Sequence, residues 1–338
     1  MTAPSAASAT AVAVPIPLPA PVTRQTLLFN ALMFSEYRRA LVVRRRQVVR
    51  RTRPERAVPS VLAVRSADRR ANEESAMSLI PFPHRPVTDA AHLGTVLGVW
   101  AHPDDEAFLS GGLMAAARDA GRRVVCVTAT LGERGTTDPR RWPPDRLGRV
   151  RRHELDASLA ALGVEEHHLL GITDGTCATQ PRDAVVDRLA GIIDAVAPDT
   201  IVTFGPDGLT GHEDHQTVSA WTTAACSAVA PDTRLLYATT TEEFVEGWEP
   251  AREAFDVFLA DGLPLRTPES ELAVHLRLDS TVLDRKVVAL RAQATQMAGL
   301  IAAVGEDRVR QWWSTEAFVS ADSTSTGARP WGTWRVAA

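Results

Sequence analysis

Two short stretches of the chain hold side chains of the kinds that bind metal ions. The first, HPDDE at residues 102–106, directly follows an apolar run, and the second is GHEDH at residues 211–215. A catalytic zinc takes three His or carboxylate ligands and keeps one position open for water. His102 and Asp105 are three residues apart across a turn, so they could face one point. Together with His215 they could supply the three ligands.

Three further side chains in these stretches suit proton transfer and charge stabilisation. Asp104 would lie beside the metal, where a carboxylate can take the proton from a water whose pKa the ion lowers to about 7. His212 is three residues from His215, and in its protonated form it could stabilise a tetrahedral oxyanion or protonate a leaving amine. Asp214 could hydrogen-bond a histidine and fix its tautomer. The set predicts a metal-dependent hydrolase of an amide or an ester.

Strands that alternate with helices must position these stretches. The predicted strands are 95–101, 123–130, 167–170, 200–204 and 235–239, and the predicted helices are 106–120, 146–162, 182–197 and 214–229. This alternation predicts an α/β fold with a mostly parallel, doubly wound sheet and helices on both faces. Polar clusters follow four of the strands, at residues 102–106, 132–137, 173–175 and 205–215. Because ligands bind at the carboxyl edge of such a sheet, we expect these clusters to converge.

The chain after residue 239 is less regular. One more strand is predicted at 274–278, and a helix at 280–297 carries Lys286, which either forms a structural ion pair or contacts substrate. The segment 307–318 contains Trp312 and Trp313 and is predicted to pack into the core. We therefore expect one folded domain over residues 89–320, followed by a C-terminal tail at 321–338.

Charge is distributed unevenly along the 338 residues. Residues 1–88 are rich in Arg, Pro and Ala and contain 14 arginines against five acidic residues, a net charge of +9. The whole chain carries −4, so residues 89–338 carry −13, which does not favour nucleic-acid binding by the folded domain. We expect 1–88 to be a disordered extension. A tether to an anionic surface or RNA, and a later natural start at Met33 or Met77, remain alternatives.

The cysteines and the hydropathy favour a reducing compartment. Cys126, Cys177 and Cys226 are far apart and form no CxxC pair, which argues against a zinc site built from cysteine. No apolar run approaches the roughly 20 residues of a membrane helix. The N-terminal residues lack a basic segment followed by an apolar one, so they do not resemble a secretory signal. We expect a soluble, cytoplasmic protein.

The sequence resembles a known enzyme family over about residues 95–297. AHPDDE at 101–106, followed by two glycines at 111–112, resembles the signature of the PIG-L-like (LmbE-like) deacetylases. GHEDH at 211–215 looks like their second motif, HxDH. The pattern R-x-x-E-L at 151–155 is similar to a helix of the same family. The first two motifs together are highly specific, and the resemblance does not cover residues 1–88.

The resemblance implies a Rossmann-like fold and zinc-dependent removal of an acyl group from an N-acyl amino sugar. On the matching positions it places zinc on His102, Asp105 and His215, a ligand set that ferrous iron would also suit. It makes Asp104 the general base and His212 its electrostatic or general-acid partner. The implied partner is a small amino-sugar conjugate.

The resemblance also implies roles around this centre. Asp214 would orient a histidine, Arg151 and Asp174 would contact the sugar, and Glu133 would line the pocket. The C-terminal helix departs from the family pattern, which commonly has His followed by Ser-Gln. Gln293 and the pair 295–296, Thr-Gln, occupy those places. The identity of the amino-sugar conjugate therefore stays open.

Two other functions are consistent with the sequence. The enzyme could be an amidase that cleaves a larger acyl group from a thiol-sugar conjugate. Alternatively, the chain could bind a sugar without turnover, with its basic extension as a tether to an anionic partner. A binding role does not require a base beside a metal, so the intact His/Asp set favours an N-deacetylase that uses zinc.

Overall fold

The computed structural model describes residues 86–249, 255 and 257–322. The predicted extension, 1–88, and the predicted tail, 321–338, lie almost wholly outside the described residues. Within the described part of the extension, Val87 pairs with the sheet. Its N–H donates to the carbonyl of Ala273 (2.8 Å), and its carbonyl accepts from the N–H of His275 (2.9 Å). Backbone pairing therefore begins inside the range that we assigned to the extension.

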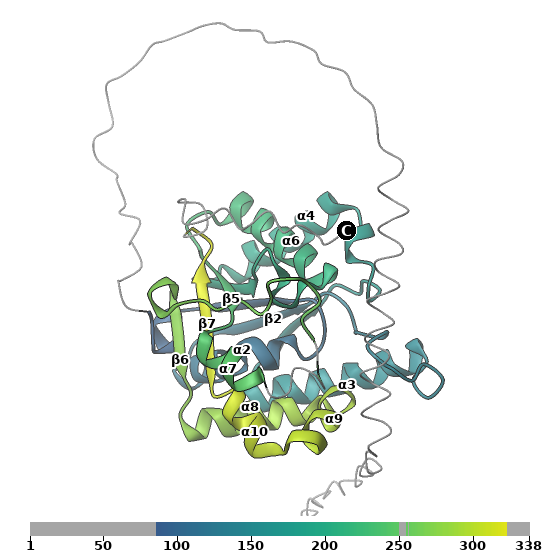
Figure 1. The fold of residues 1–338 in the computed structure, drawn as a ribbon. Coiled ribbons are helices and arrows are strands. Elements are labelled where there is room, and N and C mark those ends of the chain that lie inside the picture. The colour runs from purple at the N-terminus through teal and green to yellow at the C-terminus, as the bar shows by residue number, and fades with distance from the viewer. Residues whose placement is uncertain (1–85, 250–254, 256, 323–338) are drawn as a thin grey trace, which may run out of the picture.

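A seven-stranded sheet forms the centre of the described fold (Figure 1). Its strands are β1 (Val96–Trp100), β2 (Val124–Thr128), β3 (Glu166–Leu169), β4 (Thr200–Phe204), β5 (Arg234–Thr239), β6 (Val274–Arg277) and β7 (Thr315–Ser320). The spatial order is β3-β2-β1-β4-β5-β7-β6. The first five are parallel, whereas β7 is antiparallel to both of its neighbours. The prediction of a mostly parallel, Rossmann-like α/β sheet is confirmed.

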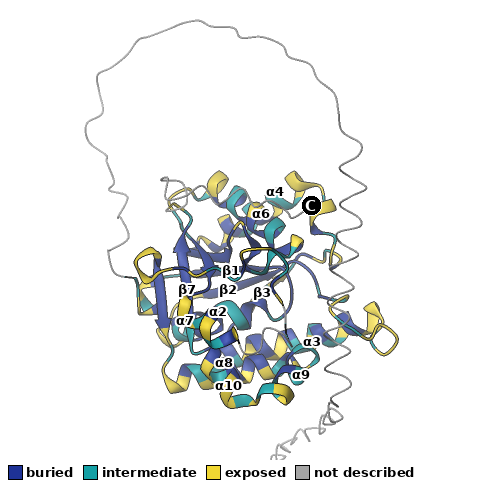
Figure 2. Cartoon of the chain, in the orientation of Figure 1, coloured by how far each residue is buried: buried dark blue, intermediate teal, exposed yellow. Residues whose placement is uncertain are grey.

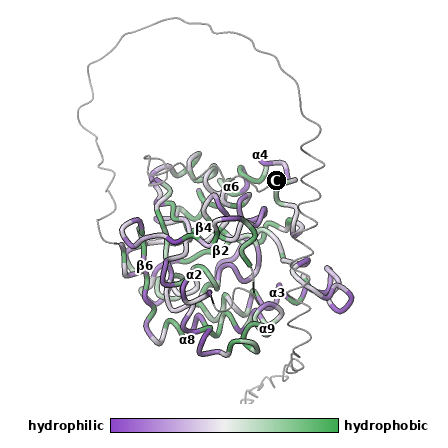
Figure 3. The backbone as a smooth tube through the Cα atoms, viewed as in Figure 1, coloured by the Kyte–Doolittle hydropathy of each residue, from purple (hydrophilic) through white to green (hydrophobic). Residues whose placement is uncertain are grey.

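The central strands are apolar because helices cover the sheet on both sides. Every residue of β1, β2 and β4 is buried, and Figure 2 shows these strands in dark blue. Figure 3 shows the same centre as largely hydrophobic, with polar segments towards the periphery. Edge strand β3 has the sequence EHHL, and its residues alternate between exposed and half-buried. Central strands of a parallel sheet are typically buried on both faces, whereas an edge strand is less covered.

Helices form a layer on each face of the sheet. The longer ones are α2 (Asp105–Asp119), α3 (Pro144–Leu162), α4 (Arg182–Val196), α6 (Glu213–Val229), α8 (Ser280–Ala292) and α9 (Ala294–Val304). Helices α4 and α6 pack together on one face, and α2, α3 and α8 pack together on the other (Figure 1). Short helices complete the described fold: α5 (Gly208–Gly211), α7 (Glu242–Trp248), α10 (Glu306–Trp312) and the 3-10 turns η2 (Ala90–Leu93), η3 (Cys177–Thr179) and η5 (Glu269–Glu271).

The prediction of one continuous helix over 280–297 is wrong. Helix α8 ends at Ala292 and α9 begins at Ala294, with a bend of 113° between them. The segment 307–318, predicted only to pack, contributes α10 and most of β7, and Trp312 and Trp313 are buried as expected. No single helix among the described residues is long and apolar enough to span a membrane. Helices α8 and α9 reach the length and composition of a membrane span only when they are taken together across their bend.

A buried ion pair ties α8 to β7 and α2. Lys286 is 0% exposed, and its Nζ lies 2.6 Å from Oε1 of Glu316. Glu316 also accepts the N–H groups of Gly112 and Leu113, within α2, both at 2.7 Å. Burial lowers the pKa of Lys286, while Glu316 opposes that shift. Of the two interpretations of Lys286, the structure therefore supports the ion pair.

Replacing Lys286 with Met should lower the free energy of unfolding by about 3–5 kcal/mol, because Glu316 would stay buried without its cation. Urea denaturation followed by circular dichroism measures this change. Arg291→Gln is the matched control on the same helix, since the pair of Arg291 with Glu306 is exposed. That control should change stability by less than about 1 kcal/mol. Equal losses in the two variants would contradict the assignment.

Candidate active site

The turn between β1 and α2 is built by its own polar side chains. The N–H of His102 donates to Oδ2 of Asp105 (2.8 Å), and the N–H of Asp104 donates to Oε2 of Glu106 (2.8 Å). Asp104 has a φ of 111°, a conformation that non-glycine residues rarely adopt. The predicted arrangement of strand, tight turn and helix is therefore present, and the turn lies at the carboxyl edge of the parallel strands.

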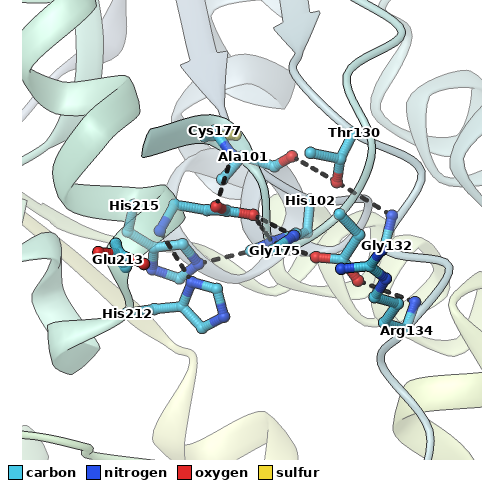
Figure 4. A network of polar contacts seen from close by, with 12 residues as sticks. Ala101, His102, Thr130, Gly132, Arg134, Gly175, Cys177, His212, Glu213 and His215 are labelled. Atoms are coloured by element: carbon cyan, nitrogen blue, oxygen red, sulfur yellow. Dashed lines mark hydrogen bonds and ion pairs between the residues drawn. The ribbon is translucent and has the colours of Figure 1, made fainter. Parts of the chain in front are cut away.

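Two imidazole rings, one from each predicted stretch, face each other. Nδ1 of His102 lies 3.1 Å from Nε2 of His215. The opposite nitrogen of His215, Nδ1, lies 3.0 Å from the carbonyl of Gly208, which only accepts hydrogen bonds. The opposite nitrogen of His102, Nε2, lies 3.1 Å from Asp174 and 3.3 Å from Asp214. These partners place a hydrogen on the outer nitrogens, Nδ1 of His215 and Nε2 of His102. The inner nitrogens, Nε2 of His215 and Nδ1 of His102, face each other and can share a proton or a cation (Figure 4).

The carboxylate of Asp105 lies close to both inner nitrogens. Its Oδ2 lies 3.6 Å from Nδ1 of His102, and its Oδ1 lies 3.6 Å from Nε2 of His215. Burial raises the pKa of Asp105, but the two histidines outweigh it and hold that pKa at about 2. Two imidazole nitrogens beside a carboxylate form a donor set that suits zinc and similar divalent ions. The structure thus brings together the three residues predicted as ligands.

The electrostatics around His102 favour a positive charge. Burial lowers the pKa of His102, yet Asp105, Asp174 and Asp214 together raise it well above its usual value. The same carboxylates would attract a cation to the inner nitrogens. Ligand atoms of His102, His212 and His215 also lie within 4.8 Å of one another, as do those of His102, Asp174 and Asp214. His212 is thus a further nitrogen donor within reach of the centre.

Asp214 and His212, at the start of α6, lie close to these rings. Asp214 is 1% exposed, and its carboxylate accepts the N–H groups of Gly175 (2.7 Å) and Cys177 (3.1 Å). The histidine that it faces is His102. Nδ1 of His212 accepts the N–H of Asp214 (3.1 Å), which leaves Nε2 of His212 as a donor. Burial lowers the pKa of His212, so its neutral form is favoured.

Asp104 has the surroundings of a base. Nη2 of Arg151 lies 3.0 Å from Oδ2 of Asp104, and the Asp104 side chain is 16% exposed. Burial raises the pKa of Asp104 to about 8, against the lowering effect of Arg151. A carboxyl group with a pKa near 8 is mostly protonated at pH 7, and a nearby divalent cation would favour its carboxylate form, which is the form that can accept a proton. The structure places this carboxyl group next to the candidate metal ligand Asp105.

Arg151, predicted to contact a sugar, is a buried support of the turn. Its Nη1 donates to the carbonyl of Gly132 (2.8 Å), and its Nη2 donates to the carbonyl of Pro103 and to Asp104. A Cβ at Gly132, where φ is +58°, would overlap Nη1 of Arg151, so glycine is required there. Contact between Arg151 and a sugar stays a prediction.

Asp174 and Glu133, the other predicted pocket residues, are joined to each other and to the centre. Asp174 accepts the N–H of Arg134 (2.9 Å) and faces His102, and its own N–H donates to Oε1 of Glu133 (2.9 Å). Oε2 of Glu133 is buried and has no partner among the described residues. Their roles towards a sugar also stay predictions.

Sequence reasoning missed several groups that hold the site. The carbonyl of Gly208 fixes the ring of His215, and the N–H groups of Gly175 and Cys177 hold Asp214. Backbone groups carry no residue-type signal. Glu106 was quoted as part of the first motif without a role. It is 0% exposed and contacts the backbone of Asp104.

Known proteins resemble this chain in sequence. The family described as PIG-L, GlcNAc-PI de-N-acetylase, matches residues 97–226, which include both stretches that hold the candidate metal ligands. A 1D-myo-inositol 2-acetamido-2-deoxy-alpha-D-glucopyranoside deacetylase from Actinosynnema mirum is 39% identical, and the match covers 60% of this chain and 80% of that protein. A protein of the same description from Corynebacterium glutamicum is 33% identical, and the match covers 60% of this chain and 74% of that protein.

Among solved structures, N,N'-diacetylchitobiose deacetylase from Pyrococcus horikoshii aligns with a TM-score of 0.48 at 20% identity. That alignment covers 71% of this chain and 88% of the other. Membership rests on the sequence relatives and on the two motifs, whose residues meet in one site. The chain belongs to the PIG-L (LmbE-like) family of de-N-acetylases.

Proposed function

We propose that the protein is a metal-dependent N-deacetylase that acts on a GlcNAc–inositol conjugate, 1D-myo-inositol 2-acetamido-2-deoxy-alpha-D-glucopyranoside. The observation that carries this proposal is the convergence of His102, His215 and Asp105 on one point, with the carboxyl group of Asp104, held by Arg151, beside it. The substrate is the one named for the similar deacetylases of Actinosynnema mirum and Corynebacterium glutamicum.

His102, Asp105 and His215 would hold the metal ion. Their inner nitrogens and carboxylate suit zinc, and ferrous iron is the second candidate. When bound, such an ion supplies Lewis acidity: it polarises the amide carbonyl and lowers the pKa of a nearby water to about 7. Asp214, held by two backbone N–H groups, keeps the ring of His102 in place.

The chain's own residues handle the protons. Asp104 takes a proton from the attacking water, and Arg151 keeps its carboxylate in position. The Nε2–H of His212 donates to the oxyanion that forms on the former carbonyl oxygen. The amide C–N bond then breaks, and the proton held by Asp104 passes to the leaving nitrogen. One water is consumed, and acetate and a free amino sugar are formed.

Amine release from the GlcNAc–inositol conjugate tests this proposal. We expect one primary amine and one acetate for each amide cleaved, loss of activity on chelation, and recovery on adding Zn²⁺ or Fe²⁺. A cysteinyl amide of the deacetylated sugar, assayed in parallel, tests the amidase alternative. Release from the cysteinyl amide alone, or no release from protein that holds one equivalent of metal, would overturn the proposal.

A further inference from the structure

The unusual backbone of Asp104 is held by a buried side chain. At a φ of 111°, a non-glycine residue is in a sparsely populated region that costs of order 1–3 kcal/mol. The Asp104 N–H donates to Oε2 of Glu106 at 2.8 Å. This hydrogen bond can help to hold the turn in its strained form, provided that the carboxylate of Glu106 is itself fixed.

Two donors fix the other oxygen of Glu106. Its Oε1 accepts from Oγ of Ser158 at 2.8 Å and from Nε2 of Gln293 at 2.9 Å. Ser158 comes from α3, and Gln293 lies at the bend between α8 and α9. All three side chains belong to residues that are 0% exposed. A chain of hydrogen bonds therefore runs from the bend to the backbone of Asp104.

The amide at position 293 is only partly satisfied. Oε1 of Gln293 is buried and has no hydrogen-bond partner among the described residues. The cost of that unpaired atom offsets part of what the hydrogen bond from Nε2 to Glu106 contributes to stability. What the amide supplies, and an apolar side chain would not, is the N–H that meets Glu106.

The bend also supports Asp104 by a second route. The N–H and Oγ1 of Thr295 donate to Glu154 at 2.8 and 2.6 Å. Glu154 is on α3, three residues after Arg151, whose guanidinium contacts Asp104. At the break between α8 and α9, Gln293 therefore contacts Glu106, which bonds the backbone of Asp104. Thr295 contacts α3, the helix that carries Arg151.

We propose that Gln293 is a positioning residue, which holds the general base Asp104 in its productive orientation through Glu106. The role given to Asp104 rests on the proposed function. The contacts that connect Gln293 to it are independent of the substrate. Gln293 lies outside both metal-binding stretches, in the place where the family pattern differs from this chain.

Gln293→Met tests the proposal because Met keeps the length of the side chain and removes the N–H. We expect kcat to fall about tenfold, an increase of the activation barrier close to the strength of one hydrogen bond to a charged group. KM should stay within about twofold, and the metal content should not fall. The melting temperature should fall by only a few degrees, because Glu106 keeps the hydrogen bond from Ser158. Gln293→His should recover most of kcat, because a ring N–H can replace the amide donor.

Controls and a structural measurement separate the possible results. Gln311→Met, at an exposed position on α10, should leave kcat unchanged. A crystal structure of Gln293→Met should show the φ of Asp104 shifted away from 111°. An unchanged kcat in Gln293→Met, or a loss of kcat that only follows a loss of stability, would overturn the positioning role. If the native protein cleaves no substrate, the proposed function fails, and an unchanged Asp104 turn in the variant structure would still reject the positioning role.

Discussion

Replacing Asp104 with Asn should lower kcat by about 10²–10⁴-fold, the usual contribution of a general base. Asn has nearly the same shape, and its amide oxygen can still accept from Arg151, but it cannot take a proton at neutral pH. Because Asp104 is not one of the predicted ligands, the metal content should remain at the native level. Amine release under saturating substrate and elemental analysis of the same sample measure both quantities.

The control for this variant is Asp183→Asn, at the exposed start of α4. It makes the same chemical change at an exposed side chain on another helix and should change kcat by less than about twofold, as expected of a surface site. Near-native turnover in Asp104→Asn would remove Asp104 from the role of base. A loss of metal together with the loss of turnover would instead indicate that Asp104 is a ligand.

Replacing His215 with Ala should weaken metal binding by more than about 100-fold. Changes in groups that merely orient ligands cost 10–100-fold, and His215 is predicted to be a ligand itself. Hydrolysis should disappear together with the metal. Competition with a zinc-binding dye measures the affinity, and amine release at saturating zinc shows whether turnover returns when the site is refilled.

His153→Ala is the control, because His153 is an exposed histidine on α3. It should keep native zinc affinity and native turnover. The ring of His215 also stacks on Phe204, with centroids 4.1 Å apart, so the melting temperature of the metal-free His215→Ala protein must be compared with that of the metal-free native protein. A full equivalent of tightly held zinc in folded His215→Ala would refute the ligand assignment.

Much of the fold could be predicted because its signals are local. The strands β1, β2 and β4 are short apolar runs that end in polar turns, and the helices between them have ordinary lengths. Two features depended on distant contacts. The bend at Gln293 has no proline or glycine, and its polar contact is with Glu106, which lies 187 residues away in sequence. β7 contains Glu316, whose burial depends on Lys286.

The candidate site shows the same division. The residues that face one another, His102, Asp105 and His215, could be listed from their types and from their positions at strand ends. The way in which they are held could not, because much of that support comes from backbone groups and from side chains on other elements. Arg151 illustrates the limit: its type and motif were recognised, but its burial beneath Asp104 is visible only in three dimensions.

The place of β7 in the sheet has a consequence for synthesis on the ribosome. β7 is the last strand in the part of the chain that the structure describes, yet it lies between β5 and β6, which are made earlier. Until Ser320 has been made, β5 has an unpaired edge, and among the described residues β6 has only its bridge to Val87. Such an edge can pair with other chains. A message truncated before Thr315 should therefore yield an aggregation-prone product, even though it encodes every residue of the candidate metal centre.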